Sequence, residues 1–272
     1  MRVIPKRPIL VTLSAGLVLA AGSLGVAAAR GRSAPPEPVR DEARIREQDI
    51  VFYEWRLARD PTSAFDLAQL AMLHLQRGRE RGDPEEVRRA EQLARTSLVE
   101  RATRNARGYG TLISSLLSQH RFTEALAQAE RVVALDSTSV PARAVLAEIQ
   151  MELGEYDAAR RTFGALYPQR SDLAVAPRLA RWLELQGQVE AARRLLTGAR
   201  AEARIRPKMP REQVAWFHLR VGDLELRTGH LGAAGSAFRE GLAVAPADAR
   251  LLAAMARLEA TRARWGRAVE YG

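Results

Sequence analysis

Residues 221–246 of the 272-residue chain read VGDLELRTGHLGAAGSAFREGLAVAP. Two apolar, helix-forming segments flank Gly229, and a glycine at such a place can adopt the left-handed conformation that ends a helix. Ala234 is small enough to let two crossing helices approach, and Phe238 follows one turn later on the same face. Pro246 stops the second segment. The stretch therefore predicts a helix, a tight turn and a second helix packed against the first.

The same arrangement recurs along the chain. Each copy has an alanine equivalent to Ala234, and the six positions are Ala90, Ala125, Ala159, Ala192, Ala234 and Ala268. Subtracting successive numbers gives intervals of 35, 34, 33, 42 and 34 residues. A period near 34 with two helices per unit is the spacing of tetratricopeptide repeats.

Five copies also carry a large residue followed by a small one in the first helix. The large residue fills the core between helices, and the small one lets the partner helix come close. These pairs are Leu70-Ala71, Leu146-Ala147, Leu179-Ala180, Val221-Gly222 and Met255-Ala256. Gly154 and Gly187 repeat the turn glycine, and Phe163 and Leu196 repeat the large residue after the alanine.

On these motifs, residues 64–272 resemble a tetratricopeptide-repeat (TPR) array of about six units, the last incomplete. The best copy departs from the family pattern at His218, Glu225 and Gly241, where Trp, Tyr and Ala are usual. The resemblance implies an all-α, right-handed α-solenoid of helix-turn-helix repeats. As a whole, the chain also resembles exported bacterial TPR proteins of uncharacterised function.

Composition excludes several other classes of protein. The chain has no cysteine, which rules out disulfide scaffolds, Cys-ligated metals and cysteine nucleophiles. Aromatic residues make up 6% of the chain, which is sparse for a β-sandwich or barrel. The 48 alanines, with many Leu, Arg and Glu, favour helices.

The net charge of +10 raises the question of nucleic-acid binding. Forty of the 42 basic residues are arginine, but they are scattered among 32 acidic residues. No basic block with interleaved aromatic residues occurs. We therefore expect a solvated, ion-paired helix surface and no nucleic-acid partner.

Residues 1–29 have the pattern of a secretory signal peptide. Basic residues at positions 2, 6 and 7 precede an uncharged segment, 9–29, which ends in three alanines. The segment is also just long enough to span a bilayer, so an uncleaved anchor is the alternative. Either way, we expect an exported protein, periplasmic or secreted, or one tethered to the membrane.

Residues 30–40 predict a Pro-containing linker, and residues 41–60 a lead-in helix with Ile45, Ile50, Phe52, Tyr53 and Leu57 on one face. Two insertions are expected between helices, at 77–84 and at 205–210. The sixth unit stops about ten residues short of a full repeat, which predicts a longer native chain or an end docked on a partner.

The family geometry places certain first-helix positions on the concave groove of the solenoid. The resulting candidate peptide-binding residues are Arg107, Ser114, Glu148, Met151, Arg181, Glu184, Trp216, Asp223, Arg250 and Arg257, with Leu117, Ala144, Leu219, Leu226 and Ala253 beside them. Apolar positions between charges of both signs suit an extended peptide or a partner helix. Trp216 is the strongest single anchor, with packing against the preceding unit as the alternative.

The groove lacks the Lys and Asn of relatives that clamp a terminal carboxylate, so that mode of binding is not expected. The four histidines, His74, His120, His218 and His230, form no metal or catalytic motif. We expect His74 and His218 to be partly buried and the other two to lie at turns.

The sequence therefore predicts a non-catalytic protein-interaction scaffold without cofactor or metal. Three alternatives stay open. They are a TPR subunit of an envelope assembly for polysaccharide or outer-membrane machinery, a nucleic-acid-binding protein, and the regulatory front part of a longer chain with an enzymatic domain. The sequence leaves the oligomeric state open.

Overall fold

A computed structural model of the chain describes residues 42–271. In that range the secondary structure is helical throughout, without a strand. The predicted signal or anchor segment, 1–29, and the linker, 30–40, lie outside the described residues. Between residues 42 and 271, no helix is long and apolar enough to cross a membrane.

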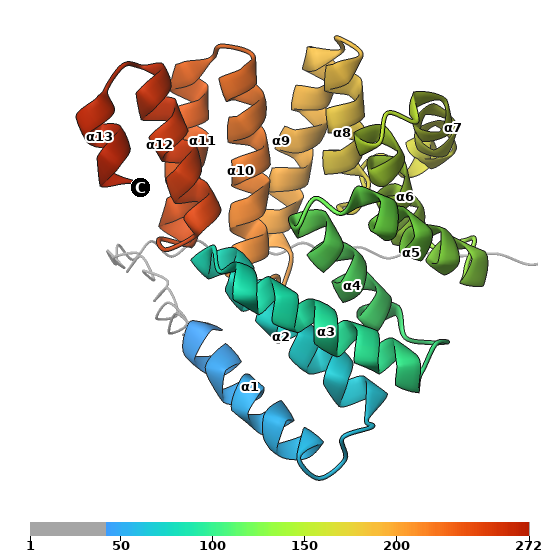
Figure 1. Cartoon of the computed structure of the whole chain (residues 1–272). Coiled ribbons are helices and arrows are strands. Elements are labelled where there is room, and N and C mark those ends of the chain that lie inside the picture. The colour runs from blue at the N-terminus through green and yellow to red at the C-terminus, as the bar shows by residue number, and fades with distance from the viewer. Residues whose placement is uncertain (1–41, 272) are drawn as a thin grey trace, which may run out of the picture. The chain divides into compact units, whose positions relative to one another are not determined.

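The described helices form a lead-in helix followed by six antiparallel pairs (Figure 1). The lead-in helix is α1, Glu42–Leu57. The pairs are α2 (Ala64–Arg81) with α3 (Pro84–Glu100), α4 (Ala106–Ser118) with α5 (Phe122–Leu135), α6 (Val140–Glu152) with α7 (Tyr156–Leu166), α8 (Ala176–Leu185) with α9 (Val189–Ile205), α10 (Arg211–Arg227) with α11 (Leu231–Val244), and α12 (Ala249–Thr261) with α13 (Trp265–Glu270). A short 3-10 helix, η1 (Tyr167–Gln169), follows α7.

Local chemistry explains where these helices begin and end. Polar N-cap side chains accept hydrogen bonds from the first-turn backbone, as Asn105 does from the N–H of Gly108 at 3.0 Å and Asp248 from that of Leu251 at 3.2 Å. The turn glycines Gly154, Gly187 and Gly229 have φ values of 78°, 76° and 81°. That left-handed conformation ends the first helix of each of three units, as the sequence predicts.

The repeat alanines lie where each pair of helices crosses. Ala90, Ala125, Ala159, Ala192 and Ala234 are fully buried, at 0% exposure. The large residues that follow three of them, Phe163, Leu196 and Phe238, are also buried. The interpretation of the alanine period as a series of close helix crossings is therefore confirmed for these five units, whereas Ala268 on the short helix α13 is only half-buried.

The lead-in helix agrees only partly with expectation. Ile50 is buried in the core that α2 and α4 share, and Tyr53 and Leu57 pack against it. Ile45 and Phe52 are exposed, which corrects the predicted apolar face. Arg46 takes their place on the packed side, where its guanidinium donates to Glu80 at 2.7 Å.

The two insertions differ from each other in structure. Residues 77–84 were expected to lie between helices, but α2 continues through most of them to Arg81, and only Gly82 and Asp83 connect it to α3. Good helix formers in this segment lengthen the helix instead of making a loop. Residues 206–210 form a loop between α9 and α10, as predicted from the two prolines there.

Units far apart in the sequence come together in the array. Helix α12 packs against α2, and a Cβ atom placed on Gly82 would lie 3.2 Å from the Cβ of Ala249. Figure 1 shows the turn between α2 and α3 beside the start of α12. In addition, the backbone N–H of Arg211 at the start of α10 donates to the Glu42 carboxylate of α1 at 3.0 Å. The first helices of all units therefore face a shared interior.

Candidate binding cavity on the inner face

A cavity of about 570 Å3 lies between the first helices. All six units contribute to it through α2, α4, α6, α8, α10 and α12, together with the segment before α8 and the loop before α10. Its lining residues are Arg79, Ser114, Leu117, Ser118, Glu148, Leu173, Ala174, Arg178, Arg206, Met209, Glu212, Gln213, Trp216, Phe217 and Arg250. The lining combines charged, polar and apolar groups, so it is suited to an amphipathic ligand.

Ion pairs across neighbouring units organise much of the charge on this face. Arg178 of α8 donates to Glu148 of α6 at 2.8 Å. On the next units, Arg250 of α12 lies 2.7 Å from Glu212 of α10, and it also pairs with the buried Asp248 at 2.6 Å. The pairs Arg178–Glu148 and Arg250–Glu212 each join one repeat to the next, whereas Arg250–Asp248 joins helix α12 to its own N-cap.

Burial and pairing act in opposite directions on the arginines. Burial lowers the pKa of Arg250, but the hydrogen bond to Asp248 and the charge of Glu212 outweigh it and raise that pKa. For Arg79, burial dominates and lowers the pKa, and the opposing charges of Glu212 and Glu148 do not outweigh it. Both guanidinium groups stay charged near neutral pH, since arginine titrates far above it.

Trp216 forms part of the cavity wall and is half-buried. Its ring contacts Phe217 edge-on, with 5.1 Å between the ring centroids. The guanidinium of Arg220 lies 5.7 Å from the centroid of the indole. Trp216 lines the cavity and also packs against the buried cluster that includes Ala176 and Ala199 of the preceding unit.

The predicted groove residues divide into groups. Ser114, Leu117, Glu148, Trp216 and Arg250 line the cavity together. A second group lies further along the first helices and forms ion pairs, namely Arg181–Glu184 at 3.0 Å, Glu184–Arg227 at 2.6 Å and Asp223–Arg257 at 3.0 Å. These pairs link α8 to α10 and α10 to α12, so the charges already have partners.

Two predicted residues lie apart from both groups. Arg107, at the start of α4, is exposed and lines a separate hollow of about 150 Å3 beside Phe65 and Arg104. Met151 is only 4% exposed and packs in the core around α6 and α8. The cavity therefore brings together only part of the predicted groove.

Several cavity residues were not predicted from the sequence. Arg79 lies in the segment taken for an inter-helix insertion, and Arg206 lies in the second insertion. Because both segments fall outside the regular repeat, positions counted from the family geometry miss them. The length and arginine content of the insertions were the available signal.

The histidines behave largely as expected. His74 is buried, and its Nδ1 lies 2.7 Å from Glu86. His218 is 2% exposed, which is deeper than predicted, and His120 and His230 are exposed at turns. Within residues 42–271, no group of three or more His, Asp or Glu side chains is arranged to hold a metal ion.

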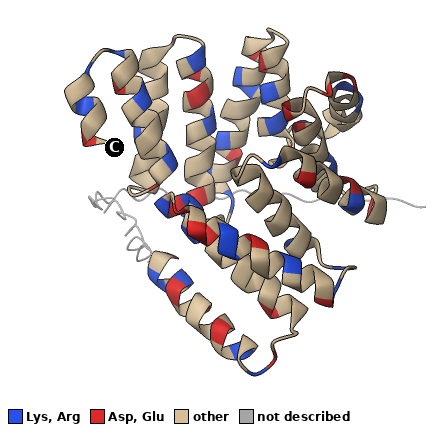
Figure 2. Ribbon diagram, viewed as in Figure 1, with Lys and Arg blue, Asp and Glu red and all other residues tan. Residues whose placement is uncertain are grey.

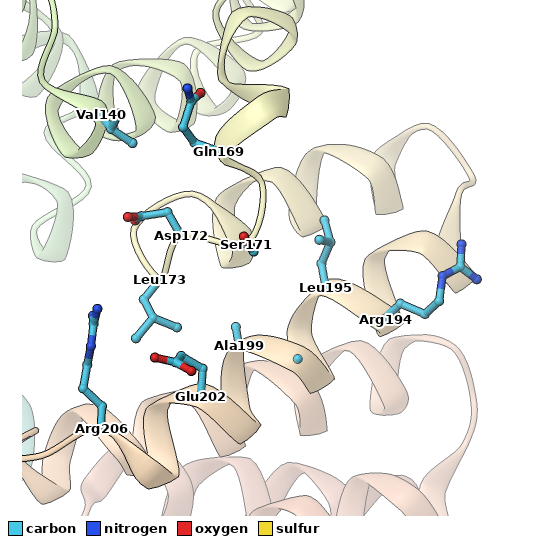
Figure 3. Close-up of a pocket in the computed structure, with 11 residues that line it drawn as sticks. Val140, Gln169, Ser171, Asp172, Leu173, Arg194, Leu195, Ala199, Glu202 and Arg206 are labelled. Carbon is cyan, nitrogen blue, oxygen red and sulfur yellow. The ribbon is translucent and has the colours of Figure 1, made fainter. Parts of the chain in front are cut away.

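A second hollow, of about 710 Å3, lies between the segment after α7 and helix α9 (Figure 3). Leu173, Leu195 and Ala199 are among its apolar lining residues, and Arg194 and Arg206 lie at its opposite ends. Arg206 also lines the inner cavity. None of the predicted groove residues lines this hollow.

Figure 2 shows acidic and basic residues interspersed over the described helices. The partly exposed ion pairs at helix ends agree with this arrangement, as in Arg121 with Glu124 at 2.6 Å. Single exposed pairs of this kind contribute little to stability. The outer surface thus matches the mixed, solvated surface that the sequence predicts.

Comparison with known proteins agrees with this architecture. Residues 116–176 match the family model described as tetratricopeptide repeat. A search of curated proteins finds no match.

Solved structures share the fold at low identity. A chain of the APC/C hetero-tetramer Cut9-Hcn1 is 14% identical, with a TM-score of 0.61 over 85% of this chain and 42% of that one. A tetratricopeptide repeat protein from Parabacteroides merdae is 13% identical, with a TM-score of 0.55 over 85% of this chain and 87% of that one. An IFIT1 mutant with m7Gppp-AAAA is 15% identical, with a TM-score of 0.58 over 76% of this chain and 49% of that one. The chain thus spans less than half the length of the first and third of these proteins.

The repeat period, the helix pairs and these likenesses agree on the fold. Residues 116–176 match the tetratricopeptide-repeat model, and the described residues have the all-α solenoid fold of tetratricopeptide-repeat proteins. Such arrays present extended inner surfaces for binding, so the fold suggests a protein–protein interaction scaffold.

Proposed function

We propose that the protein is a non-catalytic scaffold that binds a segment of a partner protein in its inner cavity. The observation that carries this proposal is the contribution of all six first helices to one cavity with mixed lining. A ligand in this cavity contacts all six repeats at once, so its binding favours the closed arrangement of the array.

The lining of the cavity suits an extended segment. Apolar side chains of such a peptide can lie against Leu117 and Phe217, and its polar groups against Ser114 and Gln213.

Site-specific photo-crosslinking in the native cells tests this proposal. Benzoylphenylalanine replaces Trp216 in one variant and Trp265, which is 67% exposed on α13, in a matched control. We expect a discrete crosslinked partner from position 216 and none from position 265. Crosslinks from position 265 alone would place the partner at the last helix and contradict the proposal.

We also propose that the protein acts outside the cytoplasm, free or tethered to the membrane. The support is the uncharged segment 9–29 after a basic start, which is a sequence pattern only. N-terminal sequencing of the protein from the cell envelope tests it. A new terminus near Arg30 indicates cleavage, and an intact terminus in the membrane fraction indicates an anchor. Intact protein in the cytoplasm contradicts export.

A further inference from the structure

The charges on the inner cavity do not balance. Four arginines and two glutamates line it, and both glutamates already pair, Glu148 with Arg178 and Glu212 with Arg250. The guanidinium groups of Arg79 and Arg206 form no ion pair or hydrogen bond with any other described residue. The cavity therefore carries positive charge that the described part of the chain does not neutralise.

Arg79 is the most informative of these residues. It lies in the final turn of α2, in the part of the helix that the insertion adds beyond a regular repeat. Its neighbours include the cationic Arg178 and Arg250. The carboxylates of Glu148 and Glu212 already pair with these two arginines. A partly desolvated cation without a partner costs free energy, so its presence needs a reason other than the stability of the fold.

A second unpaired guanidinium belongs to Arg220 on α10. Its Nε is buried without a hydrogen-bond acceptor, and its guanidinium lies 5.7 Å from the ring centroid of Trp216, which lines the cavity. The charges of Glu148 and Asp223 act on Arg220, but these carboxylates pair with Arg178 and Arg257. The first and fifth units thus each leave one arginine unmatched.

The rest of the lining indicates which anion fits. Leu117, Met209 and Phe217 supply apolar contacts, and Ser114, Ser118 and Gln213 can hydrogen-bond a peptide backbone. A polynucleotide carries one charge per nucleotide, but only Arg79 and Arg206 among the lining arginines lack a partner. An isolated carboxylate beside apolar groups matches this small number of unpaired cations.

Resting on the proposed function, we infer that the inner cavity binds an acidic peptide segment, with Arg79 as the guanidinium that receives a Glu or Asp side chain. Arginine suits this role because its planar fork holds a carboxylate through two hydrogen bonds. Arg220 and Arg206 add positive charge around that contact. The ligand carboxylate is a side chain, since the groove lacks the Lys and Asn that hold a terminal carboxylate.

Two degenerate peptide libraries test the inference with the purified full chain. Both consist of heptapeptides with blocked termini, so that only side chains carry charge. One library places Glu, Leu, Ser and Ala at random, and the other has Gln in place of Glu. We expect the protein to enrich Glu-containing peptides at least tenfold over their Gln counterparts.

Variants connect the enrichment to the cavity. Arg79→Gln should lower the preference for Glu to less than threefold, and Arg79→Lys should restore part of it. Arg161→Gln is the matched control, because Arg161 is an exposed arginine on α7 outside the cavity and should leave the preference unchanged. Circular dichroism and thermal unfolding confirm that each variant is folded. If Arg79→Gln does not fold, Arg79→Lys keeps the test informative.

Four results would overturn the inference. Equal enrichment of both libraries removes the role of charge, and an equal loss in Arg161→Gln makes the effect non-specific. Displacement of the Glu peptides by oligoadenylate at lower concentration than by free Glu peptide assigns the cavity to RNA. Absence of enrichment from either library also rejects the acidic ligand, while crosslinks from position 216 in cells would leave the proposed function standing.

Discussion

Arg79 and Arg250 line the same cavity but differ in their partners. Arg250 pairs with Glu212 and Asp248, which are both buried, whereas Arg79 has no ion pair with another described residue. The two arginine side chains thus have opposite effects on the stability of the fold. The difference is a property of the surroundings of each guanidinium, and it makes a direct comparison of the two possible.

Replacing Arg79 with methionine should stabilise the protein. Methionine keeps much of the unbranched stem and removes a desolvated charge, so we expect the free energy of unfolding to rise by about 1 kcal/mol. Arg250→Met should lower it by about 2 kcal/mol, because two buried carboxylates lose their partner. Urea unfolding at neutral pH measures both changes. A loss of stability in Arg79→Met would contradict our account of this residue.

His218 should make the protein less stable in acid. Burial and the charge of Arg200 lower its pKa, against an opposing effect of Glu240, whose carboxylate lies 3.4 Å from Nδ1. The unfolded chain then takes up a proton below about pH 6.5, where the folded state still resists it. Stability therefore falls as the pH drops from 7 to 5.

Thermal unfolding of His218→Gln across that pH range checks this. The variant should lose part of the wild-type decrease in melting temperature between pH 7 and 5. His120→Gln is the control, because His120 is exposed at a turn. Parallel pH profiles for the wild type and His218→Gln would rule out the effect.

Within a helix pair, the closest approach decides which residue can stand at the crossing. At Gly222 in α10, an added Cβ atom would lie 2.3 Å from the ring of Phe238, which is fully buried in α11. The family-like pair Val221-Gly222 therefore needs glycine here, whereas other units carry alanine at the equivalent place.

Gly222→Ala should destabilise the protein by about 1–3 kcal/mol, since Phe238 has no free space into which it can move. Gly198→Ala on α9 is the matched control, because no atom lies within 4 Å of the added Cβ. That change should stabilise the helix by about 0.5–1 kcal/mol. Urea unfolding of both variants gives the comparison. Changes of the same sign would contradict the packing argument.

At the level of the whole described array, the first and last units contact each other, and this contact closes the array. Gly82 and Ala249 are 167 positions apart in the sequence, since 249 minus 82 is 167, yet their Cβ positions are in contact. Helix α12 brings Arg250 to the cavity through the same contact. Closure is therefore what turns an open groove into a cavity.

A double cysteine variant, Gly82→Cys with Ala249→Cys, should form an intramolecular disulfide. The natural chain has no cysteine, so no other pairing competes. The separation of 3.2 Å is close to the 3.5–4.5 Å that a disulfide spans between Cβ atoms. Thiol titration and non-reducing electrophoresis measure the result. Free thiols after mild oxidation would show that the ends do not meet in solution.

The sequence was sufficient to predict the repeating unit. Ala90, Ala159 and Ala234 recur with a period that only a pair of crossing helices explains, and Gly154 and Gly229 mark the turns between them. These features could be predicted because they depend on contacts within about 34 residues, which a periodic pattern records directly. Part of the candidate site, including Trp216 and Arg250, followed from the groove geometry that the resemblance to the family implies.

The tertiary structure alone decided how the units combine. The rotation accumulated over six units brings Gly82 into contact with Ala249. It also decides that Arg178 pairs with Glu148 and Arg250 with Glu212, while Arg79 stays unpaired. Each rotation is small, and no local pattern records their sum. The helical form of residues 77–81 adds to this, because it carries Arg79 into an interior that exists only when the array closes.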